Sequence, residues 1–347
     1  MNNRPPLRIQ PSDSFFGELE QESIALFYAI KRVIVPGAWE SSPVEEKYQR
    51  LREVLLTTPG VLPGFRHLFL AAGRLNFPDS PRPKEYYLQW DNSLAGQKRA
   101  GALHLLKMAI RLYRHRPFKL EDLDDNLVGQ PTTYRIPKSF GGGFAAIGRR
   151  FFKLRNLERP ELYHVTEAQI RFLYYRMQIS TLVVPSLDSI LEIGAGYGGL
   201  AAELLQHLSV GQYFVLELPE SVPLAYFYLR ACFDCPIQVL YRPEDGLDST
   251  ARIVILAPWK LPDLGGEINL LINTMSFQHM SRENLDYYFA ELDRLKVKWM
   301  YLVNRDTQRD PTDVIVSQYP IPKCYTVLYR KPQLFGPHLE VVCKREA

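Results

Sequence analysis

The stretch SILEIGAGYGG, residues 189–199, decides the fold. Its first five residues form a short apolar run of the kind that makes a buried strand. The glycines that follow allow the backbone to turn tightly and to come close to a ligand. The run LAAELL at 200–205 then begins a helix, whose N-terminus presents unpaired N–H groups. The stretch therefore predicts a strand, a ligand-binding loop and a helix in direct succession.

Strands and helices alternate on both sides of this unit. Short apolar runs, which predict strands, occupy 189–193, 212–217, 252–256, 268–273 and 298–304. Helical patterns fall at 200–207, 220–231 and 281–295. The tail 323–344 contains two strand-like runs around the loop KPQLFGP, which predicts a closing antiparallel hairpin. We expect an α/β fold with a Rossmann-like, mostly parallel seven-stranded sheet over residues 186–347.

Residues 1–185 have a different pattern and predict a mainly helical N-terminal domain that caps the site and shapes the substrate pocket. One expected helix begins near Ile24, and two others span 94–113 and 166–179. In the last of these, Thr166 and Gln169 form a capping box. Pro- and Gly-rich loops are expected at 57–64, at 77–84 and at Gly141–Gly143. This part is net basic, whereas residues 186–347 are net acidic.

Gly194, Gly196 and Gly199 also fit the G-x-G-x-x-G pattern of dinucleotide-binding loops. Glu192 distinguishes the two interpretations, because a carboxylate at the carboxyl end of the strand would repel a pyrophosphate. S-adenosylmethionine (SAM) instead offers an ammonium and a sulfonium group. We favour SAM as the cofactor, with an NAD-dependent oxidoreductase as the alternative.

Further cofactor contacts are expected at the ends of the next strands. Glu217 stands where a ribose would present its hydroxyls, although it could also be a helix-start carboxylate. Trp259 could cover an adenine or could be a packing residue. Arg171 could pair with the cofactor carboxylate or lie on the surface. The predicted cofactor-binding residues are Glu192, Gly194, Ala195, Gly196, Gly198, Glu217, Leu218, Trp259, Asn273, Thr274 and Arg171.

Two motifs carry a family resemblance. The run ILEIGAGYGGLAAELL, 190–205, resembles motif I of class I SAM-dependent methyltransferases. The run NTMSFQHM, 273–280, followed by LDYYF, 285–289, resembles the bacterial sugar O-methyltransferase family of natural-product and glycan gene clusters. The resemblance covers about 126–345, with Val128–Pro131 as an upstream match. It implies SAM-dependent O-methylation of a hydroxyl on a small acceptor, with a sugar as the substrate class.

Methyl transfer to a hydroxyl needs alignment of the partners and removal of a proton. His279 lies where the carboxyl edge of the sheet is expected, and an imidazole titrates near neutral pH. The family often has an acid at this position, so a protein that binds SAM without catalysing transfer is a further alternative. Glu283 and Asp286 are the other candidate catalytic residues, and both could equally be solvated carboxylates on a helix face.

Composition supports a soluble enzyme. The chain has 347 residues, 46% of them hydrophobic, and a net charge of +4, which is too balanced to favour nucleic acid as a partner. No apolar run reaches the roughly 18 residues of a membrane span, and the N-terminus lacks a signal-peptide pattern. Four cysteines form no disulfide framework, so we expect a cytoplasmic protein. We predict no metal site, since Cys232 and Cys235 are more typical of buried thiols, and we expect a possible homodimer.

Overall fold

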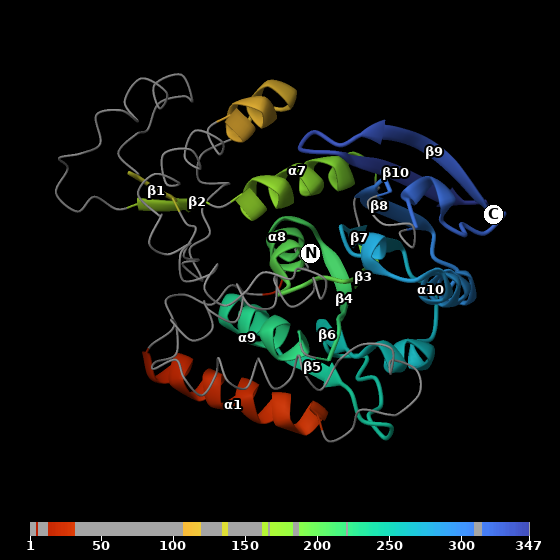
Figure 1. Ribbon diagram of the computed structural model, residues 1–347. Coiled ribbons are helices and arrows are strands. Elements are labelled where there is room, and N and C mark those ends of the chain that lie inside the picture. Colours follow the sequence, from red (N-terminus) through yellow and green to blue (C-terminus); the bar gives the residue numbers. More distant parts are fainter. Residues whose placement is uncertain are drawn as a thin grey trace. The chain divides into compact units, whose positions relative to one another are not determined.

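The structure is a computed structural model. It describes residues 5, 13–31, 107–118, 134–137, 162–165, 167–182, 187–219, 221–308 and 314–346. The chain forms two compact units, one made of Met1–Gly73 with Gln178–Ala347 and the other of Arg74–Met177 (Figure 1). Most of residues 1–185 lie outside the described part, so the helical cap domain and its boundary at residue 185 stay predictions. Predicted features at 57–64, 77–84, Gly141–Gly143, Val128–Pro131 and Thr166 also lie outside it.

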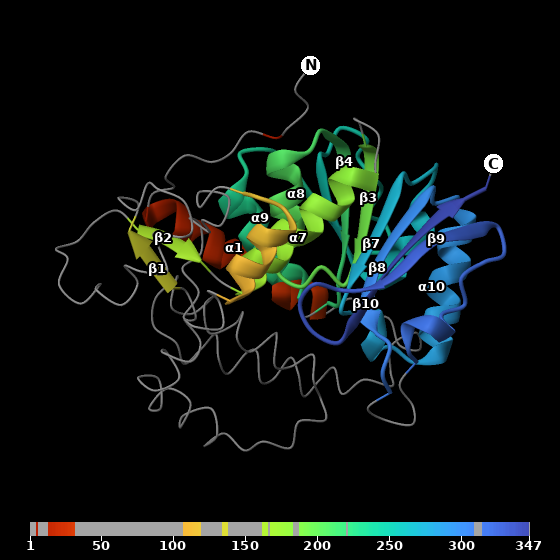
Figure 2. The same ribbon diagram turned by 90° about the horizontal axis from the view of Figure 1, so that it is seen from above.

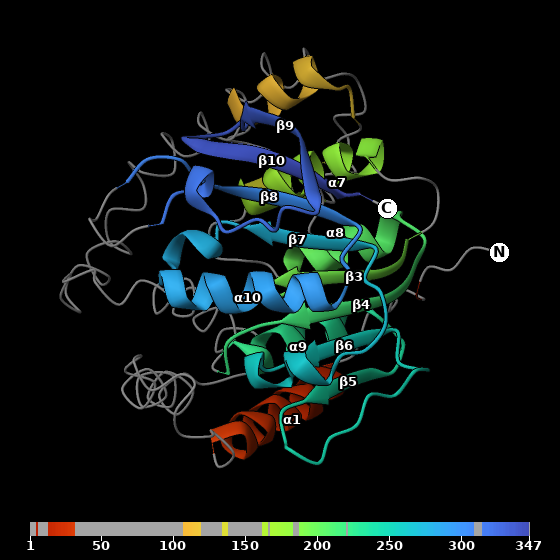
Figure 3. The ribbon, with the colours of Figure 1, turned by 90° about the vertical axis from the view of Figure 1, so that its right-hand side faces the viewer.

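An eight-stranded sheet forms the centre of the first unit. Its strands, in spatial order, are β5 Ile237–Leu240, β6 Ile253–Leu256, β4 Val210–Leu216, β3 Leu187–Ile193, β7 Leu270–Thr274, β8 Trp299–Arg305, β10 His338–Arg345 and β9 Tyr325–Pro332. Figure 3 shows the strands one beside the next in this order. The strands from β5 to β8 are parallel, and β10 is antiparallel to both β8 and β9. The predicted parallel core and closing hairpin are thus confirmed.

The predicted number of seven strands was wrong, because β5 was missed. This strand has four residues, and three of them are only half-buried. A short strand at the edge of a sheet buries few side chains, so it leaves almost no apolar pattern in the sequence.

Helices cover both faces of the sheet. The helices α8 Gly199–His207 and α9 Val222–Cys232 lie on one face and α10 Arg282–Arg294 on the other (Figure 2). This placement follows from right-handed crossovers that run in opposite directions across the sheet, from β3 through α8 to β4 and from β7 through α10 to β8. The α10 face of the core is built from Leu191, Ile193, Phe214, Leu216, Val254, Leu256, Leu271, Met300, Leu302, Leu285, Tyr288, Phe289 and Leu292.

The predicted stripe of α10 is confirmed in detail. Its four apolar residues, Leu285, Tyr288, Phe289 and Leu292, are all buried. The hydroxyl of Ser281 accepts a hydrogen bond from the backbone N–H of Asn284 at 3.2 Å, as expected of an N-cap. Local periodicity and capping therefore predict this helix from the sequence, and the core stabilises it by covering the stripe.

A helix near the start of the chain belongs to the sheet unit. The helix α1, Asp13–Lys31, begins 11 residues before the predicted start at Ile24 and packs along α9 (Figure 1). Tyr226 Oη of α9 donates a hydrogen bond to Glu22 Oε2 at 3.1 Å. Ile30 is fully buried. Part of the chain assigned to a separate cap domain therefore completes the outer layer of the sheet unit.

The second unit contains helical residues 107–115, the short antiparallel pair β1 Tyr134–Pro137 and β2 Leu162–Val165, and α7, Glu167–Leu182, up to Met177. Arg116 Nη1 donates to the carbonyl of Met177 at 3.1 Å. The predicted helix 166–179 is confirmed, since its stripe from Ile170 to Met177 is buried. The pair of strands was not predicted.

Two further observations concern the described residues. Cys232, Cys235 and Cys343 are buried free thiols, as predicted for the first two. No helix among those described is long and apolar enough to cross a membrane.

The packing of α1 on α9 predicts that Ile30→Ala lowers the free energy of unfolding by about 2–5 kcal/mol, the usual cost of an isoleucine-to-alanine cavity. Gln21→Ala, at an exposed position of the same helix, should leave stability within about 0.5 kcal/mol of the parent. Urea denaturation of the full chain measures both. Equal stabilities for the two variants would show that α1 does not belong to this unit.

Candidate functional site

The strand order reverses between β3 and β7, because β3 leads to β4 on one side while β7 and β8 lie on the other. Open α/β sheets bind ligands at the carboxyl ends of the strands at such a point. Two turns meet there. Gly194 follows β3 with φ +73°, and a Cβ at this position would lie 1.9 Å from Ser276 Oγ, in the turn after β7. Only glycine allows this approach.

The other glycines divide the loop into a packed part and an open part. Gly198 has φ +86°, and a Cβ on it would lie 3.1 Å from Leu229 Cγ of α9. Gly196 has φ +61°, and no atom of the described residues lies within 4 Å of its Cβ position. The middle of the loop therefore borders open space, where a ligand can approach the backbone closely.

A carboxylate already satisfies the loop amide that faces this space. The N–H of Gly196 donates to Glu217 Oε2 at 2.7 Å, and the N–H of Leu218 donates to Glu217 Oε1 at 3.0 Å. Glu217 is only 4% exposed and stands directly after β4, as predicted. The loop thus carries a buried negative charge where a phosphate-binding loop would offer free N–H groups.

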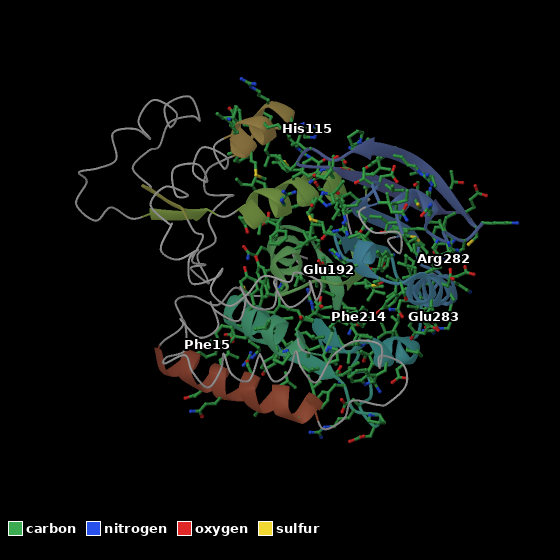
Figure 4. The ribbon with its side chains drawn as sticks, viewed as in Figure 1. Phe15, His115, Glu192, Phe214, Arg282 and Glu283 are labelled. Atoms are coloured by element: carbon green, nitrogen blue, oxygen red, sulfur yellow. The ribbon has the colours of Figure 1, made fainter. Side chains whose placement is uncertain are left out.

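Glu192 lies inside the sheet unit and not at a surface (Figure 4). Its neighbours Leu191 and Ile193 belong to the core under α10, so its side chain points to the opposite face. Tyr213 Oη donates to Glu192 Oε2 at 2.7 Å. Burial raises the pKa of this carboxyl from 4.5 to about 7, and the hydrogen bond from Tyr213 opposes the rise. The charge assumed in the sequence argument therefore depends on pH near neutrality.

Asn273 joins the two turns. It is fully buried, and its Nδ2 donates to the carbonyl of Ile193 at 2.8 Å. Its Oδ1 accepts from the N–H of Phe277 at 3.1 Å and from Asn304 Nδ2 at 2.9 Å. The side chain of Asn273 is thus engaged inside the protein, and the half-buried Thr274 follows it. Asn304 was missed, although a polar residue near the end of the apolar strand WMYLVNR is a visible signal.

His279 ends the short 3-10 helix η4, Phe277–His279, and is exposed. The preceding Gln278 is only 7% exposed. Its N–H donates to Asn304 Oδ1 at 3.2 Å, and its Oε1 accepts from the backbone N–H of Arg305 at 2.9 Å. Gln278 Nε2 lies 3.1 Å from His279 Nε2. This interaction between neighbouring side chains was not predicted.

Trp259 lies in the 3-10 helix η3, Pro258–Asp263, which follows β6. Its Nε1–H donates to the carbonyl of Tyr241, after β5, at 2.8 Å, and the side chain is half-buried. The indole is therefore fixed beyond the carboxyl ends of two neighbouring strands. Its predicted contact with an adenine stays a prediction.

Other predicted residues are not brought to the glycine loop by any described contact. Asp286 pairs with Arg282 at 2.9 Å on the exposed side of α10, and Glu283 is exposed in the first turn of that helix (Figure 4). Arg171 belongs to the other compact unit. The roles predicted for these three residues stay predictions.

A polar group beyond β8 escaped the sequence analysis. The hydroxyl of Tyr319 is buried and has no hydrogen-bond partner among the described residues. Its ring packs on Phe277 and Phe289. Burial raises the pKa of Tyr319 well above its ordinary value, while Arg305 lowers it and Asp306 raises it further. Nothing in the local sequence indicates that this tyrosine packs against the turn after β7.

No family model matches the chain, and no curated protein matches it. Among solved structures, it is similar to the mitomycin 7-O-methyltransferase MmcR, with 14% identity over 52% of this chain and 58% of that one and a TM-score of 0.33. It is also similar to the pyocyanin biosynthetic protein PhzM, with 12% identity, 60% and 63% coverage and a TM-score of 0.36. The methyltransferase domain of bacterial CtHen1 matches with 11% identity, 51% and 97% coverage and a TM-score of 0.36.

The close approach at Gly194 predicts unequal effects of two alanine substitutions. Gly196→Ala adds only the cost of a left-handed alanine, about 1–2 kcal/mol. Gly194→Ala adds the same backbone cost and a collision with Ser276, so it should lower the free energy of unfolding further. In a Ser276→Gly background the additional loss should largely disappear. Urea denaturation of the four variants gives the comparison, and equal losses for the two alanines would contradict the contact.

Burial of Glu192 predicts a pH-dependent stability. Because its pKa is higher in the folded state than the ordinary 4.5, its contribution is fully present below about pH 4.5 and is lost as pH rises through about 7. The loss amounts to about 3 kcal/mol over this range. In Glu192→Gln this loss should be absent, so the stability difference between variant and parent changes with pH. A difference that stays constant from pH 4.5 to 8 would refute the shifted titration.

Proposed function

We propose that the protein is a SAM-dependent O-methyltransferase that acts on a hydroxyl group of a small acceptor. The observation that supports this most is the hydrogen bond from the Gly196 N–H to Glu217. A dinucleotide needs the loop amides for its pyrophosphate and would meet the carboxylate instead. A cofactor with positive charge at one end and a ribose at the other suits the same groups.

In this proposal the nucleoside end lies toward Glu217, Leu218 and Trp259. Each carboxylate oxygen of Glu217 already accepts one hydrogen bond and can accept another from a ribose hydroxyl. The amino-acid end lies toward Gly194, Ala195, and the backbone of Asn273 and Thr274, since the side chain of Asn273 is engaged. Glu192 lies in β3, the strand that leads into the glycine loop, and it becomes ionised when a cation binds near it. Arg171 is proposed to hold the cofactor carboxylate.

Bound SAM would supply a methyl group on its sulfonium. The hydroxyl oxygen would displace the sulfur from this methyl, so that a C–O bond forms and the electron pair of the broken S–C bond stays on sulfur. The protein must align the hydroxyl and accept its proton. His279, Glu283 and Asp286 are the candidates from the sequence, and the ion pair with Arg282 leaves Asp286 the least available of them. Tyr319 and Asp306 add polar groups at the end of β8.

The acceptor class rests on the resemblance of residues 273–289 to sugar O-methyltransferases. We propose a sugar, as a glycoside or a nucleotide sugar. We further propose that the protein is a cytoplasmic homodimer. The net basic composition of residues 1–185 suits an acidic or phosphorylated acceptor.

Calorimetry tests the cofactor. SAM should bind and NAD should not. Glu217→Gln should weaken SAM binding about 10- to 100-fold, because the NH₂ group of the variant can accept neither from a ribose hydroxyl nor from the Leu218 N–H, while the amide oxygen still holds the Gly196 N–H. Glu267→Gln, an exposed carboxylate paired with Lys298, is the matched control and should bind SAM as the parent does. Binding of NAD without SAM would instead establish the oxidoreductase alternative.

Turnover is measured separately, as release of S-adenosylhomocysteine in the presence of neutral sugars, nucleotide sugars and simple alcohols. Release with at least one hydroxyl compound is expected. Binding of SAM without turnover of any acceptor would support a non-catalytic binding protein.

A further inference from the structure

The orientation of the Gln278 amide is fixed by its partner on β8. The backbone N–H of Arg305 can only donate, and it lies 2.9 Å from one end of this amide. That end must therefore be the carbonyl oxygen, because two N–H groups cannot face each other. The NH₂ group of Gln278 then points to His279, whose Nε2 lies 3.1 Å away.

The orientation of Gln278 decides where His279 carries its proton. An NH₂ group is a donor only, so Nε2 of the imidazole must be the acceptor in this contact and cannot hold a proton. In a neutral imidazole the single proton then resides on Nδ1. We infer that Gln278 is a positioning residue that holds His279 as the Nδ1–H tautomer, so that His279 offers the acceptor a proton and not a lone pair.

A chain of further hydrogen bonds joins Gln278 and His279 to the glycine loop. The carbonyl of Ile193 accepts from Asn273, whose Oδ1 accepts from Asn304, whose Oδ1 in turn accepts from the N–H of Gln278. Asn273 and Asn304 are fully buried. The guanidinium of Arg305 also donates to the carbonyl of Gln278 at 3.2 Å. The backbone of Gln278 is therefore fixed through its N–H and its carbonyl, and the N–H of Arg305 sets the orientation of the side-chain amide.

The catalytic meaning of this arrangement rests on the proposed function. Nε2 is already engaged, so it cannot remove the hydroxyl proton without breaking the contact with Gln278. His279 would then bind an oxygen of the acceptor through Nδ1–H, and the proton of the reacting hydroxyl would leave to another group or to water. The acceptor would need an oxygen beside the reacting hydroxyl, as polyols such as sugars have.

The tautomer can be measured without cofactor or acceptor. In the ¹⁵N-histidine-labelled full chain, two-bond ¹H–¹⁵N correlation spectra distinguish protonated from unprotonated ring nitrogens. The chain has 7 histidines, and the His279→Asn spectrum identifies the signals of His279. We expect a protonated Nδ1 and an unprotonated Nε2 at neutral pH. A protonated Nε2 in the parent protein would overturn the inference, whatever the cofactor proves to be.

Substitution of Gln278 tests its positioning role. In Gln278→Glu one carboxylate oxygen can still accept from Arg305, while the other accepts from Nε2, so the proton should move to Nε2. Gln278→Met, which has a similar volume, should leave a mixture of tautomers. Gln318→Glu, at an exposed position, is the control for added charge and should keep the Nδ1–H form. Unchanged tautomers in both Gln278 variants would show that Gln278 does not determine which ring nitrogen of His279 carries the proton.

Activity gives the second readout, with the hydroxyl compound that reacts in the acceptor screen. An asparagine places its N–H group where Nδ1–H of histidine lies. His279→Asn should therefore retain activity better than His279→Ala, whose loss should be about tenfold and mainly in KM, as for one hydrogen bond. A general base would instead cost about 100-fold or more in kcat in both variants, which would refute the donor role.

Discussion

The structure of the site depends on the contact between Gly194 and Ser276. The neighbouring parallel strands β3 and β7 end side by side at the reversal point, and the connections that follow them run in opposite directions across the sheet. A side chain on the first glycine would keep them apart, and Asn273 adds a hydrogen bond from one end to the other. The close approach of the turn after β3 to the turn before η4 follows from this contact and this hydrogen bond.

Charge at the loop is handled by two carboxylates in different ways. Glu217 accepts two backbone N–H groups, which compensate the burial of its charge. Glu192 has only one neutral donor, Tyr213, and its pKa rises accordingly. Glu217 is therefore held in the loop by two backbone donors, whereas the charge of Glu192 depends on the pH or on a nearby cation. From the sequence alone, both carboxylates were expected to be ionised.

Features with a local cause could be predicted from the sequence. The stripe and cap of α10, the strand before the glycines and the closing hairpin are set by residues close to one another in the chain. The burial of Glu192 and its hydrogen bond could not be predicted, since the register of β4 places Tyr213 opposite Ile190, from where its hydroxyl reaches Glu192. The pairing of Gln278 with His279 depends on a backbone N–H of β8. The placement of Glu217 was correct because a strand end and a glycine loop alone determine it.

The attachment of α1 to α9 also matters during synthesis. Glu22 and Tyr226 are 204 residues apart, so at roughly 5–20 residues per second the ribosome needs on the order of 10–40 s to complete the partner of α1 after the helix itself. Throughout this interval α9, against which the helix packs, has not yet been made. The helix can therefore take its native packing only after the second half of the protein has emerged.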